Sequence, residues 1–217
     1  MKNVTKLLTL VLFFSISANS YTQSIGLKVG ANIASWAGDD IFDEDVYSSV
    51  TGLQLGLVAE IPFSDKFAVQ PELLYLQKGS AAEFEFLGDK ITTTTKFNYL
   101  EIPILAKFAL TDGPAQVFLN AGPSIGFGLN GTLTTEAGGE EEESDLDFDE
   151  EGIVRMDLGL ALGAGVQFNT GPGKLFVDVR YLMGLTSLDD SEPEEEQIDI
   201  FNRGISASVG FTFPIGN

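Results

Sequence analysis

The stretch with the most distinctive chemistry is residues 136–152, EAGGEEEESDLDFDEEG, which holds ten carboxylates and no basic residue. Alternate aspartates are the arrangement in which calcium-binding loops present their oxygen ligands. An EF-hand loop that began at Asp145 would need Gly at its sixth position and Glu at its twelfth, where this chain has Glu150 and Met156. A looser and weaker site for divalent cations would use Asp145, Asp147, Asp149 and Glu151. The alternative is a solvated loop whose charges repel one another.

The sequence contains no histidine and no cysteine. Their absence excludes disulfides, thiolate metal sites and cysteine nucleophiles, together with most zinc sites and catalytic triads. An enzyme would have to use paired carboxylates, such as Glu72 and Glu101, as general acid and general base. Ion pairing of these carboxylates with basic residues is the simpler interpretation. We therefore expect a protein that is not an enzyme and carries no cofactor.

From Ser24 onward, apolar residues alternate with small or polar residues, and no stretch has a sustained helical period. In RMDLGLALGAGVQF, at residues 155–168, every second residue is a larger apolar residue or alanine, and three of the seven residues between them are glycine. The same alternation occurs at residues 25–34, 51–61, 67–78, 97–108, 117–128, 155–168, 174–185 and 203–213. The pattern predicts eight antiparallel β-strands.

The two faces of these strands differ. One face carries Leu, Val, Ile, Ala and Phe with almost no charge, as contact with lipid requires. The other is dominated by Gly, Ser, Asn and Gln, with a few charges of nearly balanced sign that include Glu60 and Lys78. Such a face suits the narrow lumen of an eight-stranded barrel, where buried charges must be paired. The candidates for lumen ion pairs are Lys28, Glu72, Glu101, Lys107, Asp157, Asp178 and Arg180.

The connections between the predicted strands alternate between short and long. The short ones, PFSDK, TDGPA and NTGPGK, have the Pro, Gly, Asp and Asn residues of tight turns. The long ones are residues 35–51, 79–96, 129–154 and 186–201, and they hold 25 of the 32 Asp and Glu residues. Short turns at one end and long connections at the other are typical of outer-membrane barrels.

The N-terminus has the parts of an export signal: Lys2 and Lys6, the apolar run LLTLVLFFSIS, and small residues in ANS. This run is too short to span a bilayer as a helix. We predict a cleaved signal peptide at residues 1–20 and one domain at residues 21–217. The net charge of −20 argues against nucleic acid as a partner. Because the mean hydropathy is nevertheless +0.14, charged and apolar residues must be segregated.

Six phrases occur in order along the chain: IGLKVGANIA, AVQPELLYLQKG, YLEIPILAKF, NAGPSIGFGL, LGAGVQF and LFVDVRYLMGL. This set resembles the PorT-like, or "outer membrane protein beta-barrel", family of Gram-negative envelopes over nearly the whole chain after the signal. The resemblance implies an eight-stranded membrane barrel and, for some members, a link to protein secretion or surface attachment. It implies no catalytic residues, and the acidic connections match no motif of the family.

Together these observations predict an all-β fold, an eight-stranded antiparallel up-and-down transmembrane β-barrel with short periplasmic turns and four long, acidic extracellular loops. We expect it in the outer membrane, in contact with lipid and with other envelope or secretion proteins as candidate partners. Its expected role is structural, adhesive or secretion-associated, and its acidic surface would bind divalent cations weakly. The alternative is a soluble, periplasmic, lipocalin-like barrel that binds a small apolar ligand in its core.

Overall fold

The computed structural model describes residues 22–38, 47–86, 89–148, 152–189 and 199–215. The predicted signal peptide at residues 1–20 lies outside these ranges. The strands are β1 (Gln23–Ala37), β2 (Tyr47–Ser48), β3 (Val50–Pro62), β4 (Phe67–Phe86), β5 (Asp89–Ala109), β6 (Ala115–Ala137), β7 (Glu140–Leu146), β8 (Met156–Asn169), β9 (Lys174–Gly184) and β10 (Phe201–Ile215). In the part of the chain that the structure describes, no helix has the length and hydropathy of a membrane span.

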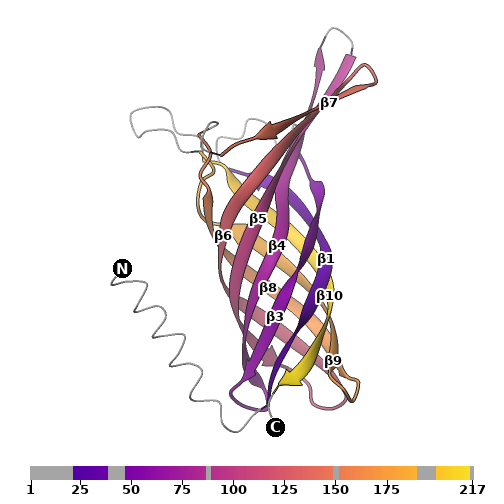
Figure 1. Cartoon of the computed structure of the whole chain (residues 1–217), viewed down its shortest axis with the longest axis vertical. Helices are drawn as coiled ribbons and strands as arrows, with labels where there is room; N and C mark the ends of the chain where they lie inside the picture. The colour runs from indigo at the N-terminus through magenta and orange to yellow at the C-terminus, as the bar shows by residue number, and fades with distance from the viewer. Residues whose placement is uncertain (1–21, 39–46, 87–88, 149–151, 190–198, 216–217) are drawn as a thin grey trace, which may run out of the picture.

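Eight of the strands pair in a ring (Figure 1). From β1 the antiparallel pairing passes to β3 and then through β4, β5, β6, β8 and β9 to β10. β10 pairs in turn with β1 along its whole length, from Gln23 opposite Ile215 to Ala37 opposite Phe201. Each strand of the ring therefore has a hydrogen-bonded neighbour on both sides, which protects its backbone groups.

All eight predicted strands are confirmed, but β4, β5 and β6 are longer than the alternating pattern indicated by eight residues or more. β4 continues to Phe86 and β5 begins at Asp89, so the predicted long connection at residues 79–96 is mainly a pair of strands. The prediction of a loop there was wrong because it relied on alternation between a buried and an exposed face. Residues 91–96 are all half-buried, and the β-branched residues of ITTTTK favour a strand without alternating.

The acidic run is also partly a strand, which corrects the prediction of a long loop at residues 129–154. β7 pairs with the end of β6, from Gly131 opposite Leu146 to Ala137 opposite Glu140. Gly138 and Gly139 form the turn, with φ values of 60° and 87° that favour glycine. With β2 paired to β4, a sheet in the order β2–β4–β5–β6–β7 extends beyond the ring (Figure 1). We call residues 47–48, 79–86, 89–96, 131–137 and 140–146 the projecting sheet.

The opposite end of the barrel has the three short turns, which confirms that the short connections lie together. They lie between β3 and β4, between β5 and β6, and between β8 and β9. In the last of them, the backbone N–H and the hydroxyl of Thr170 both donate to the carbonyl of Gly173 at 2.9 Å. β1 begins and β10 ends at this level, because Gln23 lies opposite Ile215. We call this the turn end.

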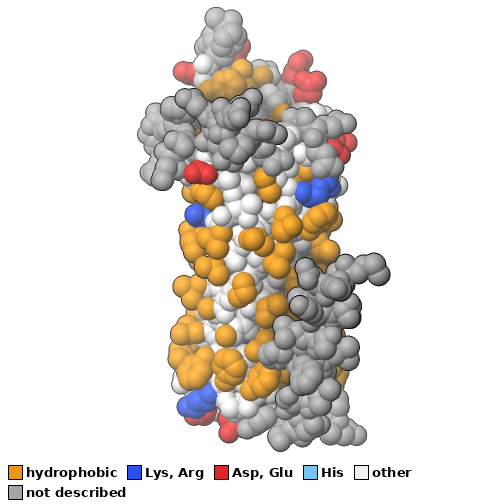
Figure 2. Space-filling view, turned by 90° about the vertical axis from the view of Figure 1, so that its left-hand side faces the viewer, with side chains coloured by type: hydrophobic (Ala, Val, Ile, Leu, Met, Phe, Trp, Pro, Cys, Tyr) orange, Lys and Arg blue, Asp and Glu red, His pale blue; other side chains and the backbone are white. Residues whose placement is uncertain are grey.

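The wall carries apolar side chains outside and charged side chains inside. Leu27 and Leu162 are 65% and 63% exposed, whereas Lys28 and Arg180 are 3% and 2% exposed. On the face shown in Figure 2, hydrophobic side chains form a band along the wall, with acidic and basic side chains above and below it. This is the arrangement predicted from the two strand faces. A lipocalin-like barrel would have an apolar core and a charged exterior, so the described side chains do not match that alternative.

The projecting sheet can be tested by removing one backbone donor. Thr94 pairs with Ala81 of β4 and Thr134 of β6. Because proline has no N–H and breaks a sheet ladder, Thr94→Pro is expected to abolish hydrogen-exchange protection in the projecting sheet while the ring stays protected. Thr94→Val, which keeps the donor and the branched side chain, is the control. Fast exchange of residues 80–86 in the unsubstituted protein would contradict the strand assignment.

Candidate functional site

The barrel lumen contains the charged residues of the predicted polar face, and they fall into three groups along its length. The central cluster is Lys28, Glu72, Asp178 and Arg180, the turn-end cluster is Glu60, Lys107 and Lys174, and the connection-end cluster is Lys78, Glu101 and Asp157. All of them except Lys174 are buried. Because isolated charges are strongly disfavoured in such surroundings, the partners of each group decide whether it is structural or reactive.

The central cluster is built around a forked contact. Arg180 donates from Nη1 to Oε2 and from Nη2 to Oε1 of Glu72, both at 2.8 Å, and it also donates to Asp178. Lys28 Nζ lies 3.5 Å from an oxygen of Glu72 and 3.5 Å from an oxygen of Asp178. Gln70 donates to Glu72 at 2.5 Å. Two cations and two carboxylates are thus balanced, and the two-point contact is the strongest geometry for such a pair.

Glycines on the polar face make room for these long side chains. Lys28 lies in register between Gly56 of β3 and Gly210 of β10, and Arg180 lies opposite Gly163 of β8. A Cβ at Gly163 would lie 2.6 Å from Cγ of Arg180, which is closer than packed carbon atoms approach. The small residues that dominate this face in the sequence therefore supply volume for the long cations.

The turn-end cluster joins one carboxylate to two lysines. Lys107 Nζ lies 2.5 Å from Oε2 of Glu60 and 2.6 Å from the side-chain oxygen of Gln167. Lys174 Nζ lies 2.6 Å from the other oxygen of Glu60. Lys107 also lies 4.3 Å from the centroid of the Phe118 ring. Both oxygens of Glu60 are therefore engaged by cations.

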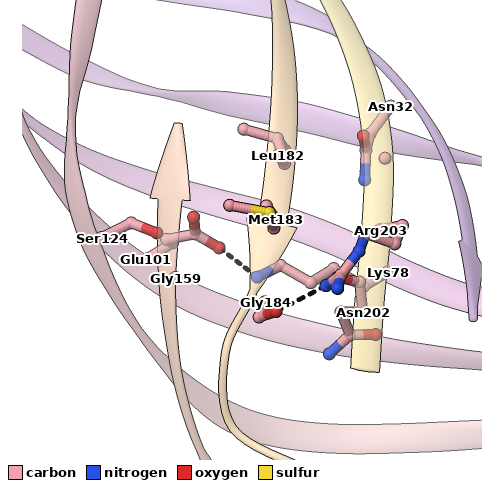
Figure 3. A pocket seen from close by; sticks show the side chains of 11 residues that line it. Asn32, Lys78, Glu101, Ser124, Gly159, Leu182, Met183, Gly184, Asn202 and Arg203 are labelled. Carbon is pink, nitrogen blue, oxygen red and sulfur yellow. Dashed lines mark hydrogen bonds and ion pairs between the residues drawn. The ribbon is translucent and has the colours of Figure 1, made fainter. Parts of the chain in front are cut away.

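The connection-end cluster joins one lysine to two carboxylates. Lys78 Nζ lies 2.6 Å from Oε2 of Glu101 and 3.0 Å from Oδ2 of Asp157, and Asn202 donates to Asp157 at 2.9 Å. Figure 3 shows a cavity of about 10 Å³ beside this cluster. There Glu101 forms an ion pair with Lys78, and Arg203 donates a hydrogen bond to the carbonyl of Gly184. This volume is about that of one water molecule, so the cluster has no room for a substrate.

The structure brings together the seven predicted lumen residues with three partners that were not in the predicted set: Glu60, Lys78 and Lys174. Lys107, for example, pairs with Glu60, which was not among the seven candidates. Alternation along a strand identifies the face of a residue and not its partner across the lumen. Lys78, for example, meets a carboxylate 79 positions away. The sequence feature that could have identified Glu60 and Lys78 was their position on the predicted polar face.

An aromatic cluster lies next to the connection-end cluster, and we call it the aromatic closure: Trp36, Phe97, Tyr99 and Phe148. Phe148 comes from the acidic run, yet it is only 1% exposed. Its ring centroid lies 5.1 Å from that of Phe97 and 6.0 Å from that of Tyr99. A side chain at Gly128 would overlap the Phe148 ring. Sequence reasoning missed this residue, although it is the one aromatic residue among the carboxylates of residues 136–152.

Backbone contacts hold the segment that carries Phe148 against the barrel. Ile153 N–H donates to the Phe148 carbonyl at 3.0 Å, and Gly128 N–H donates to the carbonyl of Arg155 at 2.7 Å. Val154 N–H donates to the carbonyl of Leu188 at 2.9 Å, which joins this segment to the connection after β9. The described ends of two long connections therefore meet beside the lumen.

The four candidate cation ligands of the acidic run do not form a described site. Asp145 is exposed on β7, and Asp147 lies 3.6 Å from the guanidinium of Arg155. Asp149 and Glu151 lie outside the described residues. Within the described ranges, no group of three or more His, Cys, Asp or Glu side chains is placed to hold a metal ion. Weak cation binding by this run stays a prediction.

Comparison with protein families gives a match to the family described as "Outer membrane protein beta-barrel domain", over residues 18–190. A comparison with curated proteins gives no match. Among solved structures, Ail of Yersinia pestis in complex with the heparin analogue sucrose octasulfate is similar, with 16% identity, a TM-score of 0.43, and coverage of 89% of this chain and 100% of that one.

Two further solved structures have a similar level of likeness. Neisserial surface protein A has 14% identity and a TM-score of 0.42, over 86% of this chain and 95% of that one. The outer membrane protease OmpT from Escherichia coli has 9% identity and a TM-score of 0.45, over 89% of this chain and 97% of that one. Likeness at this level identifies no activity.

Breaking the forked contact of the central cluster should lower the stability of the protein strongly. Arg180→Met keeps an apolar stem but removes one of the two cations that contact Glu72 and Asp178, so the free energy of unfolding should fall by about 3–5 kcal/mol. Reversible urea unfolding from phospholipid vesicles measures it. Lys66→Met is the control, because its pair with Asp112 is exposed and should contribute less than about 1 kcal/mol. Equal stability of the Arg180 variant and the unsubstituted protein would contradict a structural role for the fork.

The aromatic closure has its own reporter, since Trp36 is the one tryptophan of the chain. Phe148→Ala removes a buried ring, which typically costs about 3–5 kcal/mol, and should release the segment around it. We expect Trp36 emission to shift to the red and acrylamide quenching to increase. Phe84→Ala, at an exposed ring of the projecting sheet, should change neither signal. Unchanged quenching in the Phe148 variant would show that this ring does not shield Trp36.

Proposed function

The chain belongs to the outer membrane protein beta-barrel domain family, and we propose that it acts there as a non-catalytic barrel that presents an anionic surface outside the cell. Its location in the outer membrane and its β-barrel class follow from the family. The proposal adds that the ring spans the bilayer with its turn end in the periplasm and its projecting sheet outside. It also includes the finer assignment to the PorT-like group and a structural, adhesive or secretion-associated role.

The observation that carries the non-catalytic role is the pairing of the lumen carboxylates with basic side chains. Each of the five contacts at least one basic side chain: Glu60, Glu72, Glu101, Asp157 and Asp178. A general acid and base need a cleft in which they reach a substrate. Here the cavities beside the connection-end and turn-end clusters have only about 10 and 60 Å³, and the aromatic closure lies beside the first of them. These features support a packed interior that stabilises the barrel.

The distribution of acids supports a surface role at the other end. Residues 140–145 of β7 are all exposed, and five of the six are Glu or Asp. The short turns carry only Asp65 and Asp112. Charge gathered at one end produces a field that attracts cationic partners and repels anionic ones. Long connections of outer-membrane barrels face outward, which supports an external position for this surface. Weak binding of divalent cations is part of the same proposal.

Orientation can be tested cleanly because the chain has no cysteine. Ser144→Cys places one thiol on exposed β7, and Ala115→Cys places one at the turn end. A maleimide that does not cross membranes should label Cys at position 144 on intact cells and Cys at position 115 only after permeabilisation. The reverse order of labelling would overturn the proposed orientation.

The position 144 variant can then test the role of the surface. With a photoactivated cross-linker on its single thiol, this variant should give a discrete adduct on cells that high salt suppresses, because surface ion pairing is screened. The unsubstituted protein, which has no cysteine, is the control for non-specific capture. An adduct at position 144 that salt does not reduce would argue against a charge-driven partner.

A further inference from the structure

We propose that the outer edge of β7 is a docking site for an extended, basic polypeptide segment, which adds as the next strand of the projecting sheet. This inference rests on the proposed function, because the projecting sheet must face a partner outside the cell. It specifies the chemistry of the partner and the way in which the partner binds.

The first basis is the pairing of β7. All seven of its residues pair with β6, and within the described ranges it pairs with no other strand. A strand paired on one side presents a row of backbone N–H and C=O groups on the other, and extended segments add to such edges. Seven residues extend over about 23 Å. The other end strand of the projecting sheet, β2, has only two residues and offers a much shorter edge.

The second basis is the accessibility and rigidity of this edge. Residues 140–145 are exposed, and no other described strand pairs with this edge. β7 is fixed at one end by the turn at Gly138 and Gly139 and at the other by buried Phe148, two residues after the strand. A strand held at both ends is ordered before a partner arrives, which lowers the entropic cost of binding.

The charges of β7 select the partner. Side chains alternate along a strand, so Glu141, Glu143 and Asp145 share one face while Glu140 and Glu142 share the other. On β6 the residue opposite Glu141 is Glu136, a pair of like charges that is unfavourable across a sheet. Lysine or arginine side chains on an added strand would lie beside these carboxylates and offset the repulsion. A basic segment therefore gains both backbone pairing and charge pairing.

The same charges exclude another occupant, a second copy of this chain. Pairing of two β7 edges would bring five acidic residues of each copy against five of the other, which is strongly unfavourable. The carboxylates thus prevent self-association at an open edge while they permit a cationic partner. A flexible acidic loop would attract any polycation. Strand addition to this edge also requires that the partner has an extended backbone with free N–H donors.

Binding can be measured with a fluorescent peptide of alternating Lys and Thr and the full protein in detergent micelles, by anisotropy. The comparison peptide has the same sequence with methylated backbone nitrogens, which keeps each charge and removes each N–H. If the peptide adds as a strand, methylation should weaken binding about tenfold or more, since several backbone hydrogen bonds are lost. Equal affinity of the two peptides would overturn strand addition and leave the proposed anionic surface intact.

Variants of the protein locate the binding edge. Glu141→Gln with Glu143→Gln removes two charges from β7, and Glu83→Gln with Glu85→Gln removes two from the neighbouring β4–β5 hairpin. The first pair should weaken binding of the unmethylated peptide several-fold, and the matched pair should change it less than about twofold. Hydrogen exchange of residues 140–146 shows whether β7 stays formed in the first variant. Equal weakening by both pairs, or no binding of the unmethylated peptide, would overturn β7 as the site. Labelling of position 144 only after permeabilisation would instead overturn the proposed function.

Discussion

The fork between Arg180 and Glu72 is the contact on which the interior of this barrel depends. A wall with apolar residues outside must carry its polar groups inside, where a charge without a partner is costly. The fork and the contacts of Lys28 with Glu72 and Asp178 leave the centre of the lumen neutral. The other two clusters repeat the principle with Glu60 between two lysines and Lys78 between two carboxylates. Across the three clusters, five cations meet five carboxylates, so the lumen as a whole is neutral although the chain carries −20.

This balance explains features of the sequence that look unrelated. The side chains of Lys28 and Arg180 are long and need space inside the barrel. Glycine therefore occupies the positions beside them on the neighbouring strands, which are 56, 163 and 210. The strands thereby have a polar face of small residues, which distinguishes them from the strands of a soluble barrel. The segregation of charged residues from apolar residues follows from the same balance. With paired charges inside and apolar residues outside, the remaining acids are left for the connections, and the high net charge coexists with a positive mean hydropathy.

The alternation of residues was sufficient to predict the eight strands of the ring and the face on which each charge lies. This is because residues that face the lumen are small or polar, whereas residues on the outer face of the wall are apolar. The prediction failed for the strands that extend beyond the ring. In the projecting sheet, Thr92–Thr95 and Glu140–Glu143 form strands without alternating, and pairing rather than hydropathy defines them. Partners across the lumen also could not be predicted, since Lys78 and Asp157 meet through the curvature of the whole ring. Phe148 was missed because its neighbours in sequence are carboxylates, whereas its neighbours in space are Phe97 and Tyr99.

The acidic run therefore combines two environments in one short segment. Its first part, β7, keeps its carboxylates in water and its backbone ordered by β6. Phe148, two residues later, points inward, where it fills the space left by Gly128, and Cζ of Arg155 lies 5.4 Å from the centroid of its ring. A charged segment that was only solvated would need no such anchor, because charge repulsion alone keeps it extended. The buried ring instead fixes the end of β7 relative to the barrel, so that the exposed edge has a defined position. The run is thus a positioned strand whose backbone, and not only its charge, is presented at the surface.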